Sequence, residues 1–285
     1  MKPPPFRYAR PDSVDGVLRL LAEHDGGARV LAGGQSLIPL LNFRLARPEI
    51  LVDIAMVDGL SRLAVEDGVL RIGASVTQRA AETSDEVTRH CPLLSKALPL
   101  VGHLQNRARG TVVGSIAHAD PSAELPAVAL VLGATMAVRS AGAERIIPAD
   151  QFFLGPFTTA LEPDEMLVEV RFPARTAARV AITEIAPRSG DFALAGVAGR
   201  LAIAGDGRVQ DAALTLFGVG AVPQRLPEVE RLLVGENVTP EALDEVARVT
   251  RTTARAGSED VHADPAYRAR VAGELARRVV EETAA

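Results

Sequence analysis

The sequence predicts an α+β fold, and three patterns support this prediction. Amphipathic helical stretches alternate with short apolar strands in the first 57 residues. Runs with alternating polar and apolar residues, joined by tight turns, follow and are typical of antiparallel hairpins. Three helical stretches with apolar positions on one face complete the chain. We therefore expect sheets and helices in separate layers, with antiparallel pairing dominant after the first module.

Composition limits the possible partners. The 285 residues are 47% hydrophobic and carry a formal net charge of -5, so no basic surface excess favours binding to nucleic acid. The longest apolar run, residues 125–138, is broken by a glycine and falls short of the roughly 20 residues that cross a bilayer, so we expect no membrane span. Residues 1–11 lack the apolar segment of a secretory signal, and we expect a cytoplasmic protein.

The first module reads as βαβ-like. Ser13 can cap a helix whose apolar positions 14, 17, 18 and 21 share one face, and Gly26 and Gly27 stop that helix. A strand at 29–32, a helix at 38–45 and a buried strand at 50–54 follow.

A hairpin opens the second segment, because Asp67-Gly68 separates two alternating apolar runs and favours a type I′ turn. Beyond the hairpin, the patterns predict helices at 77–83, 92–101 and 123–132, an irregular stretch at 106–126, and strands at 134–139 and 165–172. The proline and small residues of "FPARTAARVA", at 172–181, indicate a domain boundary near residue 175.

The last part of the chain predicts an α+β unit. A long hairpin is centred on "AIAGDGRV", and helices are expected at 226–234, 239–256 and 265–283, the second opened by Thr239 as cap and Pro240 at its first position. We therefore expect two domains, 1–175 and 176–285, the first divided into subdomains of about 1–57 and 58–175.

The stretch "RVLAGGQSLIPLL", at 29–41, indicates an anion site. Gly33 and Gly34 directly follow a buried strand, so no Cβ atoms keep a ligand away from their amide hydrogens. Gln35 and Ser36 add side-chain donors, and four or five such bonds, each worth about 1.5 to 3 kcal/mol, could hold a pyrophosphate without a lysine. The alternative is a plain strand-to-helix turn in which glycine serves a positive φ and Ser36 caps the helix.

A second informative stretch covers residues 106–126. It places small or polar residues in apolar surroundings, namely Thr111, Gly114, Ser115, His118, Asp120 and Glu124, and Pro121 could start a helix with Glu124 in its first turn. A loop of this polarity between core elements lines a site or faces water. The alternative is a solvated loop in which Asp120 caps a helix.

Other signatures are missing. Neither lysine, Lys2 or Lys96, follows a glycine as a Walker loop requires, and the five histidines form no closely spaced ligand pair. Cys91 is the only cysteine, whereas an iron–sulfur cluster generally needs four thiolates. Any such cluster must therefore belong to another chain, and we expect no metal ligand here.

Taken together, "AGGQSLIPLLNFRLARP" and "RGTVVGSIAHADPSAELPAVALVLGA" resemble the FAD-binding medium subunit of the molybdenum hydroxylases, the group with aerobic carbon monoxide dehydrogenase and xanthine dehydrogenase. The resemblance extends to "TEIAPRSGDFALAGVA" at 183–198. It implies an FAD-binding region of the vanillyl-alcohol-oxidase (PCMH) type in two subdomains, followed by an α+β C-terminal domain with an antiparallel sheet and helices.

The resemblance also assigns residues to parts of FAD. Ala32, Gly33, Gly34, Gln35, Ser36 and Leu37 would wrap the pyrophosphate, and Thr111, Gly114 and Ser115 would form a second phosphate-side strip. Asp120 and Glu124 would approach the ribityl chain, with His118 in the same segment; Arg29, Val30 and Leu31 would lie beside the adenine half, and Val101 and Leu167 near the ring system.

This chain departs from the family pattern at Val113 and Ala108 of the second stretch and at Thr183. The family commonly carries Gly where this chain has Val113 and Asn where it has Ala108, and a left-handed valine would cost about 1 to 2 kcal/mol. A lysine near the flavin in some members is replaced by Thr183. Arg188 and Asp191 match a family stretch and could equally form an ion pair at a turn.

The resemblance implies an electron-transfer subunit. A molybdenum-pterin cofactor on a large subunit and two [2Fe-2S] clusters on a small subunit would supply electrons to FAD here, in a dimer of heterotrimers. No catalytic residue is expected on this chain, because the redox chemistry belongs to the cofactor. A self-contained flavin oxidase or dehydrogenase of the same fold, and a nucleotide-binding module without FAD, are the alternatives.

Overall fold

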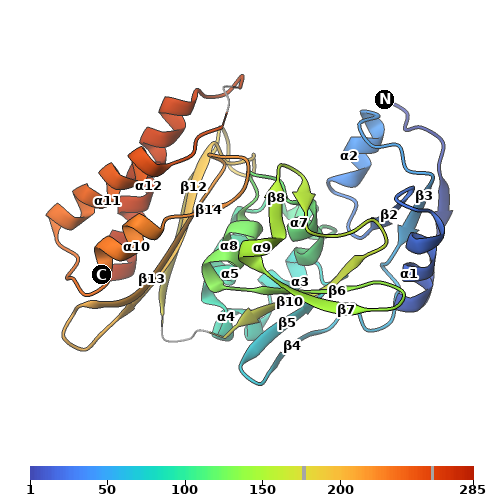
Figure 1. The fold of residues 1–285 in the computed structure, drawn as a ribbon, viewed down its shortest axis with the longest axis horizontal. Helices are drawn as coiled ribbons and strands as arrows, with labels where there is room; N and C mark the ends of the chain where they lie inside the picture. The colour runs from blue at the N-terminus through green and yellow to red at the C-terminus, as the bar shows by residue number, and fades with distance from the viewer. Residues whose placement is uncertain (175–177, 258–259) are drawn as a thin grey trace.

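The computed structural model describes residues 1–174, 178–257 and 260–285, and the expected boundary at 175/176 lies outside the described residues. Figure 1 shows three units side by side: an N-terminal lobe, a central sheet with helices, and a C-terminal sheet with helices on its outer face. No described helix is long and apolar enough to pass through a lipid bilayer.

The N-terminal lobe contains a parallel three-stranded sheet in the order β1-β3-β2. The lobe consists of β1 (Arg7–Ala9), α1 (Val14–Glu23), β2 (Ala28–Leu31), α2 (Leu37–Asn42) and β3 (Ile50–Asp53). Ser13 caps α1 as expected, accepting a hydrogen bond from Gly16 N, and the predicted face of α1 is buried. Strand β1 was not predicted, because three exposed or half-exposed residues carry no apolar pattern.

The central unit is built on an antiparallel five-stranded sheet in the order β4-β5-β10-β6-β7. The predicted turn is confirmed, since Asp67 and Gly68 both have positive φ, at 50° and 73°. The strands are β4 (Leu63–Glu66), β5 (Val69–Gly73), β6 (Thr135–Arg139), β7 (Glu144–Pro148) and β10 (Met166–Pro173), with a small ribbon of β8 (Phe153–Gly155) and β9 (Thr158–Thr159).

Short helices cover this sheet. They are α3 (Gln78–Glu82), α4 (Asp85–His90), α5 (Pro92–Ala97) with the 3₁₀ turn η1 (Leu98–Leu100), α6 (Leu104–Arg107), α7 (Val112–His118), α8 (Glu124–Leu132) and α9 (Ala149–Phe152). The expectation of an irregular stretch at 106–126 was wrong, because α6 ends and α7 lies within it. Burial of Val112, Val113 and Ile116 against the core stabilises α7, and this packing is not visible in so short a pattern.

The C-terminal unit is an antiparallel sheet in the order β11-β12-β13-β14, comprising β11 (Arg179–Ile185), β12 (Ala195–Ile203), β13 (Val209–Phe217) and β14 (Gln224–Arg225). The three predicted helices are confirmed as α10 (Pro227–Leu233), α11 (Pro240–Thr253) and α12 (Pro265–Ala284). Thr239 caps α11 through a hydrogen bond from Ala242 N, with Pro240 at the first helical position.

Both faces of the C-terminal sheet are buried. Alternate residues of β12 face opposite ways: Val197 and Leu201 join a core with α10–α12, whereas Ala198 joins the core shared with the central unit. Helix α8 packs on that second face, where Arg200 Nε donates to Val131 O at 3.2 Å (Figure 1). The C-terminal sheet is therefore packed between two helical layers.

Gly196 of β12 lies under the ring of Phe217. A Cβ at position 196 would stand 2.6 Å from Phe217 Cε1, and both residues are on the sheet face that meets the central unit. We expect Gly196→Val to lower the free energy of unfolding by about 2 kcal/mol or more, because overpacking moves a buried ring. Urea denaturation followed by circular dichroism would measure this.

Gly205→Ala is the matched control, because a Cβ there meets nothing within 4 Å. Equal stabilities of the two variants would contradict the close packing at Phe217.

Candidate functional site

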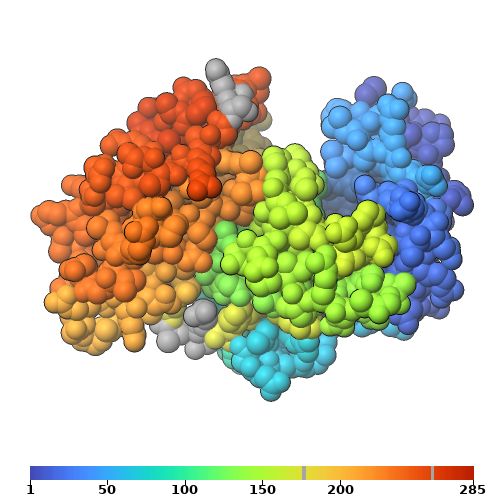
Figure 2. All heavy atoms as spheres, viewed as in Figure 1, coloured from blue at the N-terminus to red at the C-terminus, as the bar shows by residue number. Residues whose placement is uncertain are grey.

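A cavity of about 910 Å³ lies where the three units meet. Its walls come from the loop after β2, the segment from Val101 to Glu124, the β8–β9 turn, and C-terminal residues including Phe192 and His262. Figure 2 shows the hollow between the N-terminal lobe and the segment around residues 150–160. Large clefts between units with a few convergent polar groups are the usual place for a cofactor.

The structure brings together nearly all the predicted site residues. The cavity is lined by Arg29, Val30, Ala32, Gly33, Gly34, Gln35, Ser36, Leu37, Val101, Thr111, Gly114, Ser115, His118, Asp120, Glu124 and Leu167. The exception is Leu31 in β2, whose Cδ1 atom lies 3.3 Å from the position a Cβ would take on Gly34. Leu31 thus supports the loop from behind.

The two predicted loops touch through their backbones. Gly33 stands against Arg109 O, and a Cβ on Gly33 would lie 2.6 Å from Gly110 Cα, well inside van der Waals contact. Asn106 Nδ2 also donates to Gln35 Oε1 at 3.2 Å. A side chain at position 33 would therefore do more than obstruct an anion, because it would also push the two loops apart.

The loop after β2 presents unused amide donors. The N–H groups of residues 33 to 37 donate to no acceptor in the part of the chain that the structure describes. Gly34 has φ of 73°, a left-handed conformation that suits glycine. Ser36 precedes α2, but its side chain makes no capping hydrogen bond. The alternative in which Ser36 caps the helix is therefore wrong. Because amides at a site need acceptors, this loop fits an anionic group such as a pyrophosphate.

The second stretch is regular and unstrained. Thr111 caps α7, accepting a hydrogen bond from Gly114 N at 2.9 Å. Val113 lies within α7, is 2% exposed and has no positive φ, so the left-handed cost considered for valine does not arise. Ala108 follows α6 with φ of -65°, which is ordinary for alanine.

A turn after α7 carries the polar residues. Asp120 Oδ1 accepts from Ser122 N at 2.9 Å, so Asp120 forms a local turn and does not cap a helix. Helix α8 begins at Glu124, after Pro121. The His118 ring lies 5.0 Å from the Phe157 ring, and burial lowers the pKa of His118, so this imidazole is neutral at pH 7.

Two carboxyl groups near the cavity have raised pKa values. Burial first, and then repulsion from Glu184, raises the pKa of Glu124 to about 8. Burial raises the pKa of Glu184 to about 7, and its Oε2 has no hydrogen-bond partner among the described residues. A protonated carboxyl can donate a hydrogen bond, and it adds no negative charge beside an anionic ligand.

Several lining residues were missed by sequence reasoning. Gln78, His103, Phe157, Phe192, His262 and Arg268 come from segments far apart in the chain, and no local pattern connects them. The stretch 188–191 forms the expected turn, with Asp191 N donating to Arg188 O at 3.1 Å, but no ion pair joins these two described residues. Asp191 lines the cavity.

Within the described ranges, no three His, Cys, Asp or Glu side chains are grouped as metal ligands would be. Cys91 is buried, and burial raises the pKa of its thiol to about 12, which keeps it protonated.

The raised pKa of Glu124 predicts a pH-dependent stability. Its unfolded pKa is near 4.5, so the stabilisation from proton binding is complete below that pH and is lost as pH rises through about 8. For the flavin-free chain, urea denaturation should show a free energy of unfolding that falls between pH 5 and 8.5. Glu124→Gln should flatten this fall and exceed wild type by about 1 kcal/mol or more at the upper end.

Glu165→Gln is the control, because hydrogen bonding to Arg145 lowers the pKa of Glu165. The effect of this substitution on the pH dependence of unfolding therefore lies at acid pH. Parallel pH profiles for wild type and Glu124→Gln would refute the assignment.

Comparison with known proteins agrees with this architecture. Residues 4–175 match the family described as the FAD binding domain in molybdopterin dehydrogenase, and residues 181–283 match the CO dehydrogenase flavoprotein C-terminal domain. The 6-hydroxypseudooxynicotine dehydrogenase complex subunit alpha of Paenarthrobacter nicotinovorans is 37% identical over 286 residues, covering 100% of this chain and 95% of the relative.

Solved structures show the same fold. Carbon monoxide dehydrogenase from Hydrogenophaga pseudoflava, which lacks the Mo-pyranopterin moiety, superposes with a TM-score of 0.96 at 33% identity, covering 99% of this chain and 98% of that chain. Quinoline 2-oxidoreductase from Pseudomonas putida 86 gives 0.95 at 36% identity, covering 100% and 98%. The α+β fold expected from the resemblance is thus confirmed. This chain belongs to the family of FAD-binding flavoprotein subunits of molybdenum-dependent dehydrogenases.

Proposed function

We propose that this chain holds one FAD in the central cavity and passes electrons from iron–sulfur clusters on a small partner subunit to an external acceptor. The flavin, when bound, supplies the redox chemistry, since it can exchange electrons singly or in pairs. The protein's own residues bind and orient it. The observation that carries the proposal is that residues 33 to 37 line a cavity of about 910 Å³ while their N–H groups find no acceptor among the described residues.

Each part of the cavity suits a part of FAD. We assign the pyrophosphate to residues 32–37 and to Thr111, Gly114 and Ser115, because main-chain amides bind phosphate oxygens without a lysine. Arg29 and Val30 are assigned to the adenine half, Asp120 and Glu124 to the ribityl chain, and Val101 and Leu167 to the ring system, and all of them line the cavity. The neutral Glu124 and His118 support this assignment, since neither opposes an anion.

We further propose a large molybdopterin subunit and a small iron–sulfur subunit as partners, in a dimer of heterotrimers. The relative from Paenarthrobacter is named as a subunit of a complex, which supports such an assembly. The lone buried Cys91 suits a reducing compartment, and we propose the cytoplasm. The division into domains 1–175 and 176–285, with subdomains near 1–57 and 58–175, is supported by the separate sheets of the three units.

Gly34→Val should abolish FAD retention. Position 34 needs a left-handed backbone, so a β-branched residue there would turn the neighbouring amides away from the phosphates. We expect at least a hundredfold weaker FAD binding, equivalent to losing about 3 kcal/mol, the worth of one or two charged hydrogen bonds. Titration of the flavin-free chain with FAD, followed by flavin fluorescence, would measure it.

Gly59→Val is the matched control, since Gly59 has φ of 80° and a Cβ there meets nothing within 4 Å. It should carry the same backbone cost and keep wild-type FAD affinity. Stoichiometric FAD in Gly34→Val would count against the phosphate assignment.

The proposed partners and the division of labour between subunits are tested on the native assembly. When this chain is used to capture the native assembly, the purified assembly should contain about four iron atoms and one molybdenum per FAD, as two [2Fe-2S] clusters and one molybdenum centre require. The chain alone, loaded with FAD, should oxidise no organic substrate with a dye acceptor. Substrate turnover by the single chain would instead identify a self-contained flavoenzyme.

A further inference from the structure

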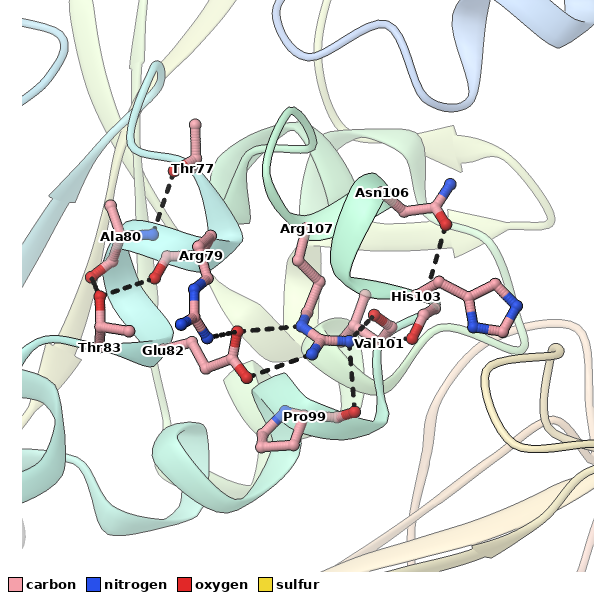
Figure 3. Close-up of polar contacts among 11 residues, drawn as sticks. Thr77, Arg79, Ala80, Glu82, Thr83, Pro99, Val101, His103, Asn106 and Arg107 are labelled. Atoms are coloured by element: carbon pink, nitrogen blue, oxygen red, sulfur yellow. Dashed lines mark hydrogen bonds and ion pairs between the residues drawn. The ribbon is translucent and has the colours of Figure 1, made fainter.

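Arg107, in the last turn of α6, is a buried cation with a full set of partners. Arg107 is only 9% exposed to solvent. The guanidinium donates to both carboxylate oxygens of Glu82, from Nε at 3.0 Å and from Nη2 at 3.2 Å. Its Nη1 donates to the carbonyl oxygens of Pro99, Val101 and Gly102 at 3.4, 3.2 and 2.9 Å (Figure 3). One side chain thus holds three carbonyls of a single loop.

The other backbone hydrogen bonds of the loop 99–103 are local, from Val101 N to Leu98 O at 3.2 Å and from Arg107 N to His103 O at 3.0 Å. Pro99 and Leu100 end η1, residues 101–103 link η1 to α6 without joining any strand, and Gly102 is left-handed with φ of 52°. Val101, Gly102 and His103 nevertheless line the cavity. Because three of the loop's carbonyls face the guanidinium, the direction in which Val101 and His103 enter the cavity depends on Arg107.

The same loop connects other walls of the cavity. Asn106 accepts from His103 N at 3.2 Å and donates to Gln35 of the loop after β2. On its other side, the His103 ring faces Gly190, where a Cβ would lie 2.5 Å from His103 Nδ1. Displacement of residues 99–103 would therefore reach both the phosphate-side loop and the C-terminal wall.

We propose that Arg107 is a positioning residue for the flavin, which fixes the loop 99–103 from behind and so sets how the cavity holds the ring system. This inference rests on the proposed function. Arg107 does not line the cavity, so it acts through Val101 and His103. Glu82 and Arg79 complete the network: hydrogen bonding to Arg107, together with Arg79, lowers the pKa of Glu82, which keeps the carboxylate charged as the partner of the guanidinium.

Arg107→Met and Arg107→Lys, made in the full chain and loaded with FAD, test the proposal. Methionine keeps the stem but removes all five donors. We expect FAD to dissociate about tenfold faster or more, which is the effect of losing one hydrogen bond to a charged group. We also expect a changed visible spectrum of the bound flavin. Lysine keeps the charge but lacks the planar fork of arginine, so it cannot bind both Glu82 and three carbonyls. The rate of FAD dissociation from Arg107→Lys should therefore lie between those of Arg107→Met and wild type.

Arg200→Met is the matched control, because Arg200 is also buried, at 8% exposure, and donates to Val131 O, and neither residue lines the cavity. It should lower stability without changing the FAD dissociation rate or spectrum. If Arg107→Met does not fold, Glu82→Gln is tested instead. This substitution weakens the two hydrogen bonds between the Arg107 guanidinium and residue 82 while keeping the shape of the side chain.

The outcomes separate the two claims. Faster FAD release and an altered spectrum in the Arg107 variants, with Arg200→Met unchanged, support the positioning role. Unchanged release and spectrum in Arg107→Met, or in Glu82→Gln if methionine does not fold, overturn it, as would equal effects from Arg200→Met. Failure of the wild-type chain to bind FAD would overturn the proposed function itself.

Discussion

The backbone contact between Gly33 and the Arg109–Gly110 peptide underlies the cavity. Two segments more than seventy residues apart approach here so closely that no side chain fits between them. The N–H groups of residues 33 to 37, which find no acceptor among the described residues, and the start of α7 at Thr111 and Gly114 line the same cavity, and Asn106 ties the two segments through Gln35. Without this approach, the N-terminal lobe and the central unit would not share a wall, and neither loop alone could enclose a dinucleotide.

The charges around the cavity follow from this arrangement. The loop after β2 presents main-chain donors at the cavity wall, and burial shifts two lining side chains toward their neutral forms, as the raised pKa of Glu124 and the lowered pKa of His118 show. Main-chain donors cannot lose a proton or swing away, so they hold an anion with little reorganisation. A chain with a formal net charge of -5 can therefore bind a dianionic cofactor without a lysine in the cavity.

Buried arginines recur as supports for irregular backbone. Arg107 holds the carbonyls before α6, Arg200 reaches Val131 O, and Arg268 donates to Leu194 O and Gly218 O at the C-terminal wall. Each also pairs with a carboxylate, so neither the cation nor the carbonyls are left unsatisfied. The guanidinium suits this use because its planar fork serves several acceptors at once and stays charged when buried.

The sequence by itself determined the elements whose signals are local. Ser13 and Thr239 mark helix starts through their own side chains, and Asp67-Gly68 forces a turn through its backbone. The glycine and polar stretches carry the family resemblance and contain fourteen of the predicted residues that line the cavity, and the resemblance alone added Val101 and Leu167. Only the tertiary structure decided that residues 112–118 form a helix, that Gly33 meets Arg109, that Phe192 and Arg268 line the same cavity, and that Arg107 holds Gly102 O. These depend on burial and on contacts between distant segments, whose energies no local pattern of residues records.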